Sequence, residues 1–271
     1  MKKLNVLAAV IAASASLVAV NANAYQAEVG ATMNVVSPEK GKNATGFGVD
    51  GTYHFAPVQD NQSQPLAEQA FLQNSSNIHA GTSFAKMGEV KTTVVNAGAT
   101  YYVPGTQFAG MLDAGHSNFK DSTDDSVKIN VVRAGVGYKP SNDLLLQGGI
   151  AYSQVKTEVK NDTSYASSSV SNTSPYIGAK YLTKVGANDL NLEANATLGD
   201  NKVVSLGADY YFDRTFSVGT GYSANHPDVG SSTDAFSFRA KKFFTPEMSL
   251  EGTASFGDDN KTYVVRGAYR F

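Results

Sequence analysis

The sequence contains no cysteine and no tryptophan, and only 17% of its residues are charged. Without cysteine there is no disulfide framework, no thiolate metal site and no cysteine nucleophile. The charged share lies below the roughly 25% of ordinary soluble domains. Basic and acidic residues number 22 and 24, so the strongly basic surface of a nucleic-acid binder is missing as well. We therefore expect no nucleic-acid partner.

Long apolar runs are absent after residue 24, which excludes the stretch of about 18 residues that a helical membrane span needs. The first residues differ. Lys2 and Lys3 precede a mostly apolar stretch over 4–20, and Ala22-Asn23-Ala24 supplies the small-residue pattern of a cleavage site. This layout predicts a cleaved signal peptide over 1–24 and a single exported domain over 25–271. An uncleaved membrane anchor is the alternative.

Alternation of apolar and polar residues dominates the exported part. In 188–198, leucine and alanine take every second position from Leu190 to Leu198, with Asn191, Glu193 and Asn195 between them. Successive side chains of a strand point to opposite faces, so this pattern predicts a strand with one apolar and one polar face. The same reasoning predicts fourteen strands in all, near 25–36, 44–55, 76–87, 90–102, 106–117, 127–139, 143–157, 171–182, 189–198, 202–212, 215–224, 233–243, 247–257 and 262–271.

Connection lengths and aromatic residues indicate which β fold this is. Short turns alternate with longer polar connections, expected at 37–43, 117–126, 160–169 and 225–232. Aromatic residues gather at both strand ends: Tyr101, Tyr138, Tyr181, Phe212, Phe244 and Phe271 at one, and Tyr152, Tyr222, Phe236, Phe256 and Tyr263 at the other. Membrane barrels have both features, with aromatic girdles flanking an apolar band. A soluble β-sandwich also alternates and is the competing interpretation.

The predicted fold is all-β: a closed antiparallel transmembrane β-barrel of about 14 strands, within bounds of about 12 and 16 because strand limits are read to within a few residues. Closure removes the sheet edges, whose unpaired backbone groups would be costly in lipid. One short helix is expected near 66–74, because Pro65 precedes residues that favour helix. Strand parity places it on the periplasmic side, where it either caps the rim or folds inward as a plug.

The polar face of such a barrel would surround water, since barrels wider than eight strands are not filled by side chains. It carries charges that we expect to line a pore: Arg133, Lys180, Glu193, Asp209, Arg239, Lys241, Glu251, Arg266 and Arg270. Six of these residues are basic and three are acidic, which weakly favours the passage of anions. Structural ion pairs that stiffen the wall are the alternative role.

Several motifs carry little weight. Gly46-Phe47-Gly48-Val49-Asp50-Gly51 spells a dinucleotide fingerprint, but it lies inside an alternating strand and does not open a helix. Asp121, Asp124 and Asp125 do not have the spacing of a calcium loop. No G-x-S-x-G elbow is present. We therefore expect no catalytic residues, no metal site and no cofactor, and we do not expect an enzyme.

Two stretches resemble a known family. The ending, with Tyr263, Val265, Tyr269 and the terminal Phe271 on one phase, resembles the assembly signal that the barrel-insertion machinery reads in bacterial outer-membrane proteins. The segments 53–58 and 65–72, which read YHFAPV and PLAEQAFL, are similar to the putative general bacterial porin family of Gram-negative bacteria. The resemblance implies a channel-forming outer-membrane barrel. The small size and the lack of an obvious long constriction loop depart from trimeric general porins.

The expected function is a water-filled porin through which small hydrophilic solutes and ions diffuse passively. Its expected partners are outer-membrane lipid, the insertion machinery and these solutes. The sequence allows either a monomer or an oligomer. The alternative is a structural or adhesive outer-membrane barrel whose lumen is closed and whose loops bind partners.

Overall fold

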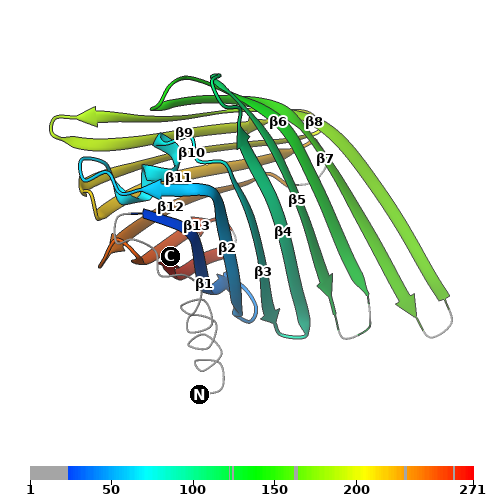
Figure 1. Ribbon diagram of the computed structural model, residues 1–271. Coiled ribbons are helices and arrows are strands. Elements are labelled where there is room, and N and C mark those ends of the chain that lie inside the picture. The colour runs from blue at the N-terminus through cyan, green and yellow to red at the C-terminus, as the bar shows by residue number, and fades with distance from the viewer. Residues whose placement is uncertain (1–23, 122, 124, 162–163, 229–230, 259) are drawn as a thin grey trace.

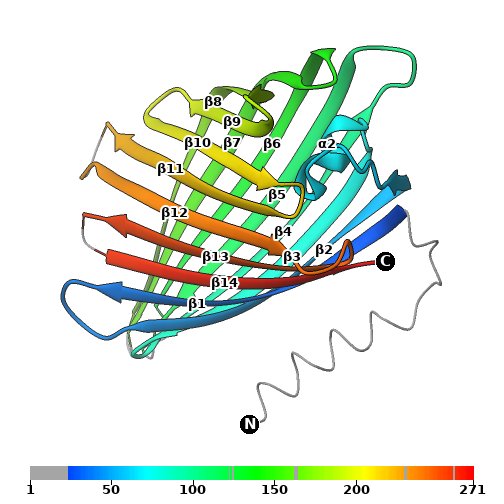
Figure 2. The ribbon, with the colours of Figure 1, turned by 90° about the vertical axis from the view of Figure 1, so that its left-hand side faces the viewer.

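The computed structural model describes residues 24–121, 123, 125–161, 164–228, 231–258 and 260–271. The expected leader lies outside this part, except for Ala24, which begins the first strand. Fourteen antiparallel strands form one closed barrel, in which β1 pairs with both β2 and β14 (Figures 1 and 2). The predicted fold class is thus confirmed.

Each strand pairs with its neighbours in the chain, so the barrel is a simple up-and-down meander. The strands are β1 (Ala24–Pro38), β2 (Ala44–Gln59), β3 (Asn77–Met87), β4 (Val90–Tyr102), β5 (Phe108–Lys120), β6 (Ser126–Ser141), β7 (Leu144–Asn161), β8 (Ser164–Val185), β9 (Asn188–Thr197), β10 (Asn201–Asp213), β11 (Phe216–Pro227), β12 (Thr233–Phe243), β13 (Met248–Gly257) and β14 (Asn260–Arg270). An even number of strands brings both chain ends to one end of the barrel. We call this the terminal end and the opposite one the loop end.

The apolar phase faces outward. Leu192, Leu206 and Leu250 have 39%, 52% and 45% of their surface exposed, although they lie mid-strand. The expected aromatic rows also lie on this outer face, where Tyr222 and Phe236 pack with their ring centroids 4.9 Å apart. Such a surface suits hydrocarbon, because the backbone groups behind it are paired around the whole ring.

The expected long connections are mostly wrong. Strand β7 continues to Asn161 and β8 begins at Ser164, so most of the expected loop over 160–169 is paired strand. The expected loop over 117–126 shrinks in the same way to residues 121–125. Backbone pairing needs no apolar side chain, and the Ser-rich start of β8 shows no alternation that could reveal it. The strands β7 and β8 therefore extend beyond β6 and β9 at the loop end.

The connection between β2 and β3, residues 60–76, contains the expected helix as a single short turn. It comprises η1 (Leu66–Glu68) and α2 (Gln69–Leu72). In Figure 2 this helix lies within the ring of strands, at the terminal end. We call residues 60–76 the strap. None of the helices in the described residues is long and apolar enough to cross a membrane.

Candidate functional site: the lumen and its strap

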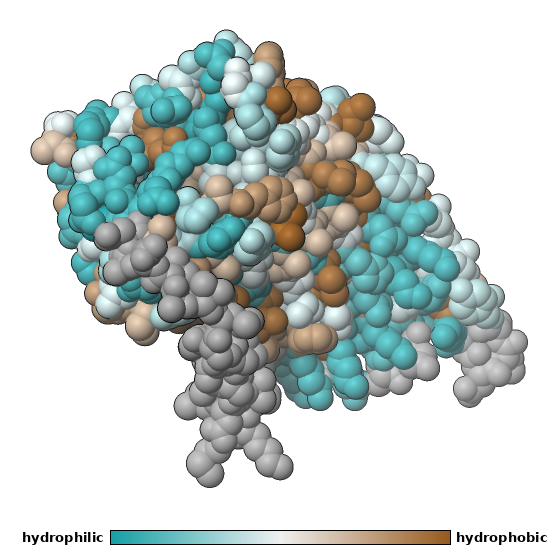
Figure 3. Space-filling model, in the orientation of Figure 1, coloured by the Kyte–Doolittle hydropathy of each residue, from teal (hydrophilic) through white to brown (hydrophobic). Residues whose placement is uncertain are grey.

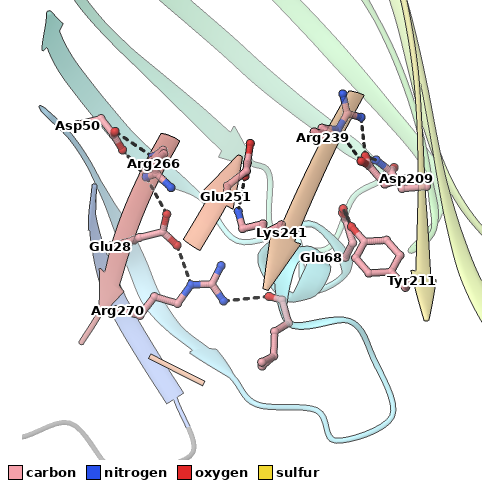
Figure 4. A network of polar contacts seen from close by, with 12 residues as sticks. Glu28, Asp50, Glu68, Asp209, Tyr211, Arg239, Lys241, Glu251, Arg266 and Arg270 are labelled. Carbon is pink, nitrogen blue, oxygen red and sulfur yellow. Dashed lines mark hydrogen bonds and ion pairs between the residues drawn. The ribbon is translucent and has the colours of Figure 1, made fainter. Parts of the chain in front are cut away.

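Charged side chains on the inner phase form a connected network near the terminal end (Figure 4). At the seam between β14 and β1, Arg270 Nε lies 2.7 Å from Glu28 Oε2 and Arg266 Nη2 lies 3.0 Å from Glu28 Oε1. Arg266 Nε also donates to Asp50 Oδ1 on β2, at 3.0 Å. One arginine thus ties three strands together, as the planar guanidinium fork allows.

Further ion pairs continue around the wall. Arg239 on β12 holds Asp209 on β10 through two nitrogens, with 2.6 Å between Nη2 and Oδ2. Lys241 Nζ lies 3.2 Å from Glu251 Oε2 on β13. The contact between Arg239 and Asp209 is bidentate, and bidentate ion pairs are stronger than single hydrogen bonds between neutral groups. The network therefore stiffens the wall in addition to charging it.

The strap is anchored to several walls at once. Glu68 Oε2 lies 2.9 Å from Lys180 Nζ on β8, and Glu68 Oε1 accepts a hydrogen bond of 2.6 Å from the Tyr211 hydroxyl on β10. Arg270 Nη1 on β14 donates to the Leu66 carbonyl at 2.9 Å. Lys139 on β6 donates to Asn74 Oδ1 at 2.6 Å and lies 4.0 Å from the centre of the Phe71 ring. Strands on different sides of the barrel therefore hold one short segment.

Inward side chains around the strap are buried, which is unusual for a barrel lumen. They come from most strands: Tyr25, His54, Ala109, Lys139, Leu145, Leu182, Asn191, Tyr211, Ser217, Phe243, Ser249 and Arg270. Leu66 and Gln69 of the strap are only 2% and 1% exposed. Leu72 packs on Leu182 and Tyr211 in a small apolar cluster. Of the two expected placements, the strap adopts the inward one and packs across the terminal mouth.

Beyond the strap the lumen is open and polar. A cavity of about 300 Å³ borders it, lined by Glu68, Asn191, Glu193, Asp209, Arg239 and Glu251 among others. A second cavity of about 290 Å³ shares Glu193 and Arg239 and continues toward the loop end past Asn195, Ser205 and Ser237. The first cavity is lined mainly by polar groups and the second by polar and apolar groups about equally, which still suits water and hydrophilic solutes.

Eight of the nine charged residues expected on the inner wall take part in these ion pairs. Arg133 is the exception. It lies on β6, exposed, with its guanidinium carbon 6.0 Å from the centre of the Tyr176 ring. Arg133 faces Asp113 of β5 in register. Within the part of the chain that the structure describes, Arg133 forms no ion pair.

Three acids of the network were not anticipated from the sequence: Glu28, Asp50 and Glu68. Adding them to the nine gives six basic and six acidic residues, so the excess of bases behind the expected anion preference disappears. Alternation placed Glu28 and Asp50 on the polar phase of their strands, which was the available signal. Glu68 is in the strap, where alternation says nothing.

Glycines on the inner phase make room for the network. A Cβ built on Gly219 would lie 2.0 Å from Asp209 Oδ1, and one on Gly30 would lie 2.4 Å from Arg266 Nη2. The glycines that spell a dinucleotide fingerprint, Gly46, Gly48 and Gly51, all lie within β2. A strand position cannot supply the helix N-terminus that this fingerprint needs.

The terminal residues close the seam. The Phe271 carbonyl accepts hydrogen bonds of 2.8 Å from the Gln26 and Ala27 backbone nitrogens, and Tyr269 and Phe271 stack at 6.3 Å. Among the expected aspartates of the loop, Asp124 lies outside the described residues, and Asp121 Oδ1 accepts local hydrogen bonds from Thr123 and Asp125. The described residues contain no group of three or more potential metal ligands.

Comparison with known proteins agrees with this architecture. The chain is similar in fold to the outer-membrane protein Omp33 of Acinetobacter baumannii, with a TM-score of 0.64 and 17% identity, over 93% of this chain and 100% of that one. It is also similar to the CymD monoaromatic hydrocarbon channel, with a TM-score of 0.55 and 10% identity, over 91% of this chain and 89% of that one. No curated protein sequence matches.

The family described as putative general bacterial porin matches residues 1–271, which is the entire sequence. The closed barrel with its outward apolar phase is the architecture expected of such a protein in the outer membrane. The chain therefore belongs to the putative general bacterial porin family, as an integral β-barrel of the bacterial outer membrane.

Proposed function

We propose that this protein is a water-filled channel through which small hydrophilic solutes diffuse passively, with the strap limiting passage at the periplasmic mouth. The observation that carries the proposal is the inner wall itself: ion-paired side chains surround two cavities, of which one borders the strap and the other continues toward the loop end. Selectivity in such channels follows from the radius and from the charges that line the wall. No step of this function requires a catalytic residue or a cofactor.

The nine charged residues expected from the sequence, together with Glu28, Asp50 and Glu68, would then line the pathway or its wall. Most of these charges are already paired, so we propose weak charge selectivity near the terminal end. Arg133 is the residue most available to a passing anion, because it lies against the aromatic ring of Tyr176 and not against a carboxylate.

The test combines single-channel recording with swelling of liposomes in sugars of graded size. We expect the purified chain to conduct weakly, and a variant with residues 61–74 replaced by a short Gly-Ser linker to conduct more and admit larger sugars. Equal conductance of the two chains would show that the strap does not limit passage. A lack of conductance in both would reject the channel.

A barrel with a closed lumen and a structural or adhesive role is the second candidate. The packed terminal mouth and the extension of β7 and β8 beyond the other strands favour it. The swelling assay separates the two functions, because a closed barrel admits no sugar in either form.

We also propose that the C-terminal strand directs assembly, since Phe271 ends a strand with Tyr263, Val265 and Tyr269 on its outer face. Deleting Phe271 should lower the folded fraction in the outer membrane of cells. The folded fraction can be measured by heat-modifiable mobility on gels. A full yield of folded barrel would contradict this role.

A further inference from the structure

The outer wall of β5 to β7 changes character in steps toward the loop end. Ala114, Val132 and Tyr152 face each other in register across these strands and belong to the apolar band. The next row holds polar groups. His116 Nδ1 lies 2.7 Å from Asn130 Oδ1, and Asn130 Nδ2 donates to Gln154 Oε1 at 3.3 Å. This row marks the level at which hydrocarbon ends.

Lysines occupy the outer face beyond that row. They are Lys86 on β3, Lys91 on β4, Lys120 on β5, Lys128 on β6 and Lys156 on β7, and we call them the lysine belt. Each lies at an even spacing from an outward apolar residue of its own strand, such as Phe84 and Lys86 on β3. Figure 3 shows a hydrophilic surface over the region where these strands end.

The belt places like charges directly opposite each other. Lys86 faces Lys91, Lys91 faces Lys120, and Lys128 faces Lys156 in the cross-strand register. Like charges in this position are destabilising. An anion bound between such lysines would offset the repulsion.

The protein itself supplies an anion for only part of the belt. Glu158 lies 2.8 Å from Lys128 Nζ and 2.7 Å from Lys156 Nζ, so it compensates that pair. Lys86 and Lys91 are exposed, and no ion pair is found for either among the residues that the structure describes. Lys86 and Lys91, the uncompensated half of the belt, therefore face outward at the level where the apolar band ends.

We propose that the lysine belt binds the phosphate groups of phosphorylated glycolipid in the outer leaflet of the outer membrane. A lysine keeps its charged end in the polar layer while its alkyl stem covers apolar wall below, which suits this level of the membrane. Basic residues next to an anionic leaflet attract its headgroups. A freely diffusing phosphate would need neither the apolar band beneath the belt nor its outward aspect. The occupant is therefore a membrane lipid.

The test compares two double variants of the full chain in neutral detergent. Lys86→Gln with Lys91→Gln removes the uncompensated half of the belt. Lys184→Gln with Lys202→Gln is the matched control, because it makes the same charge change at two exposed lysines that already have carboxylate partners, Asp189 and Asp228. Each protein is titrated with diphosphorylated lipid A and with the same lipid lacking phosphates, and bound lipid is counted by native mass spectrometry.

We expect the unaltered chain and the control to prefer the phosphorylated lipid. The belt variant should bind it roughly tenfold more weakly or worse, since each lysine near an anionic surface contributes on the order of a fivefold effect. Without lipid, the belt variant should be at least as thermally stable as the unaltered chain, because a repulsion has been removed. Three results would overturn the proposal: equal losses in both variants, equal binding of the phosphate-free lipid, or full competition by inorganic phosphate. None of these readouts depends on conductance.

Discussion

Glu28 on the first strand lies between Arg266 and Arg270 of the last strand, with one carboxylate oxygen toward each guanidinium. The side chains of Glu28 and Arg270 are only 16% and 6% exposed. At the seam where the barrel closes, Glu28 therefore pairs with Arg270 and shares Arg266 with Asp50. Removal of one partner from a buried ion pair leaves an uncompensated charge, which costs far more than the pair contributes.

Glu28→Gln should therefore destabilise the barrel, by about 3 kcal/mol or more. The melting temperature of the folded form, followed by gel mobility after heating, reports the effect. Glu251→Gln is the matched control, since Glu251 pairs with Lys241 at a more exposed position and should cost about 1 kcal/mol or less. Similar melting temperatures for the two variants would contradict the central place of Glu28.

Glu68→Ala should loosen the strap, because it removes both the ion pair to Lys180 and the hydrogen bond from Tyr211. Lys180 keeps its second partner, Glu193, at 2.8 Å, so the wall itself should stay intact. We expect larger or more frequent single-channel openings. Glu251→Gln again serves as control, as its ion pair lies between two strands and leaves the strap untouched. If both variants conduct alike, Glu68 does not hold the strap.

A glycine of the inner wall, Gly219, and one of the outer face, Gly252, offer a paired test. Gly219→Ala would place a Cβ against Asp209 Oδ1 and disturb the Arg239 pair, which should cost about 1–3 kcal/mol as overpacking does. Gly252→Ala meets nothing within 4 Å and should be nearly neutral. Denaturant unfolding of both variants measures the difference. Equal stability would show that the inner wall rearranges freely.

Absence of cysteine makes site-specific labelling simple. Spin labels on Leu192→Cys, Leu206→Cys and Leu250→Cys should be relaxed by oxygen, which concentrates in lipid. A label on Ser205→Cys should respond instead to a water-soluble nickel complex, because Ser205 lines a polar cavity. If the labels at the three leucines are shielded from both oxygen and the nickel complex, these positions lie in a packed protein interior. That result would contradict the membrane-barrel interpretation.

Much of the barrel could be read from alternation, and the reason is physical. Where one face meets lipid and the other meets water, as in 188–198, the period of two is strong and the strand is visible. The start of β8 was missed because both of its faces carry serine and threonine beyond the apolar band. Pairing there depends on the neighbouring strand β7, which no local pattern reveals.

Only part of the charged network could be predicted from the sequence. Arg266 and Arg239 stood out as charges on the polar phase, but their partners depend on which strands meet. The contact of Arg266 with Asp50 joins residues 216 positions apart. Glu68 could not be placed, because a short helix with polar and apolar residues fits a rim and a plug equally well. Its contacts with Lys180 and Tyr211 decided between them.

Pairing of β1 with β14 has a kinetic consequence. The first strand cannot find its second neighbour until the last residues of the chain are present, since Phe271 bonds to Gln26 and Ala27. Contacts between segments so distant in sequence form slowly, because ordering a long loop is paid in entropy before any bond is gained. Strand β1 is therefore the first to be made and the last to be fully paired, and its edge toward β14 stays without hydrogen-bond partners until then. A chaperone that binds this open edge would shorten the period in which the incomplete sheet can aggregate.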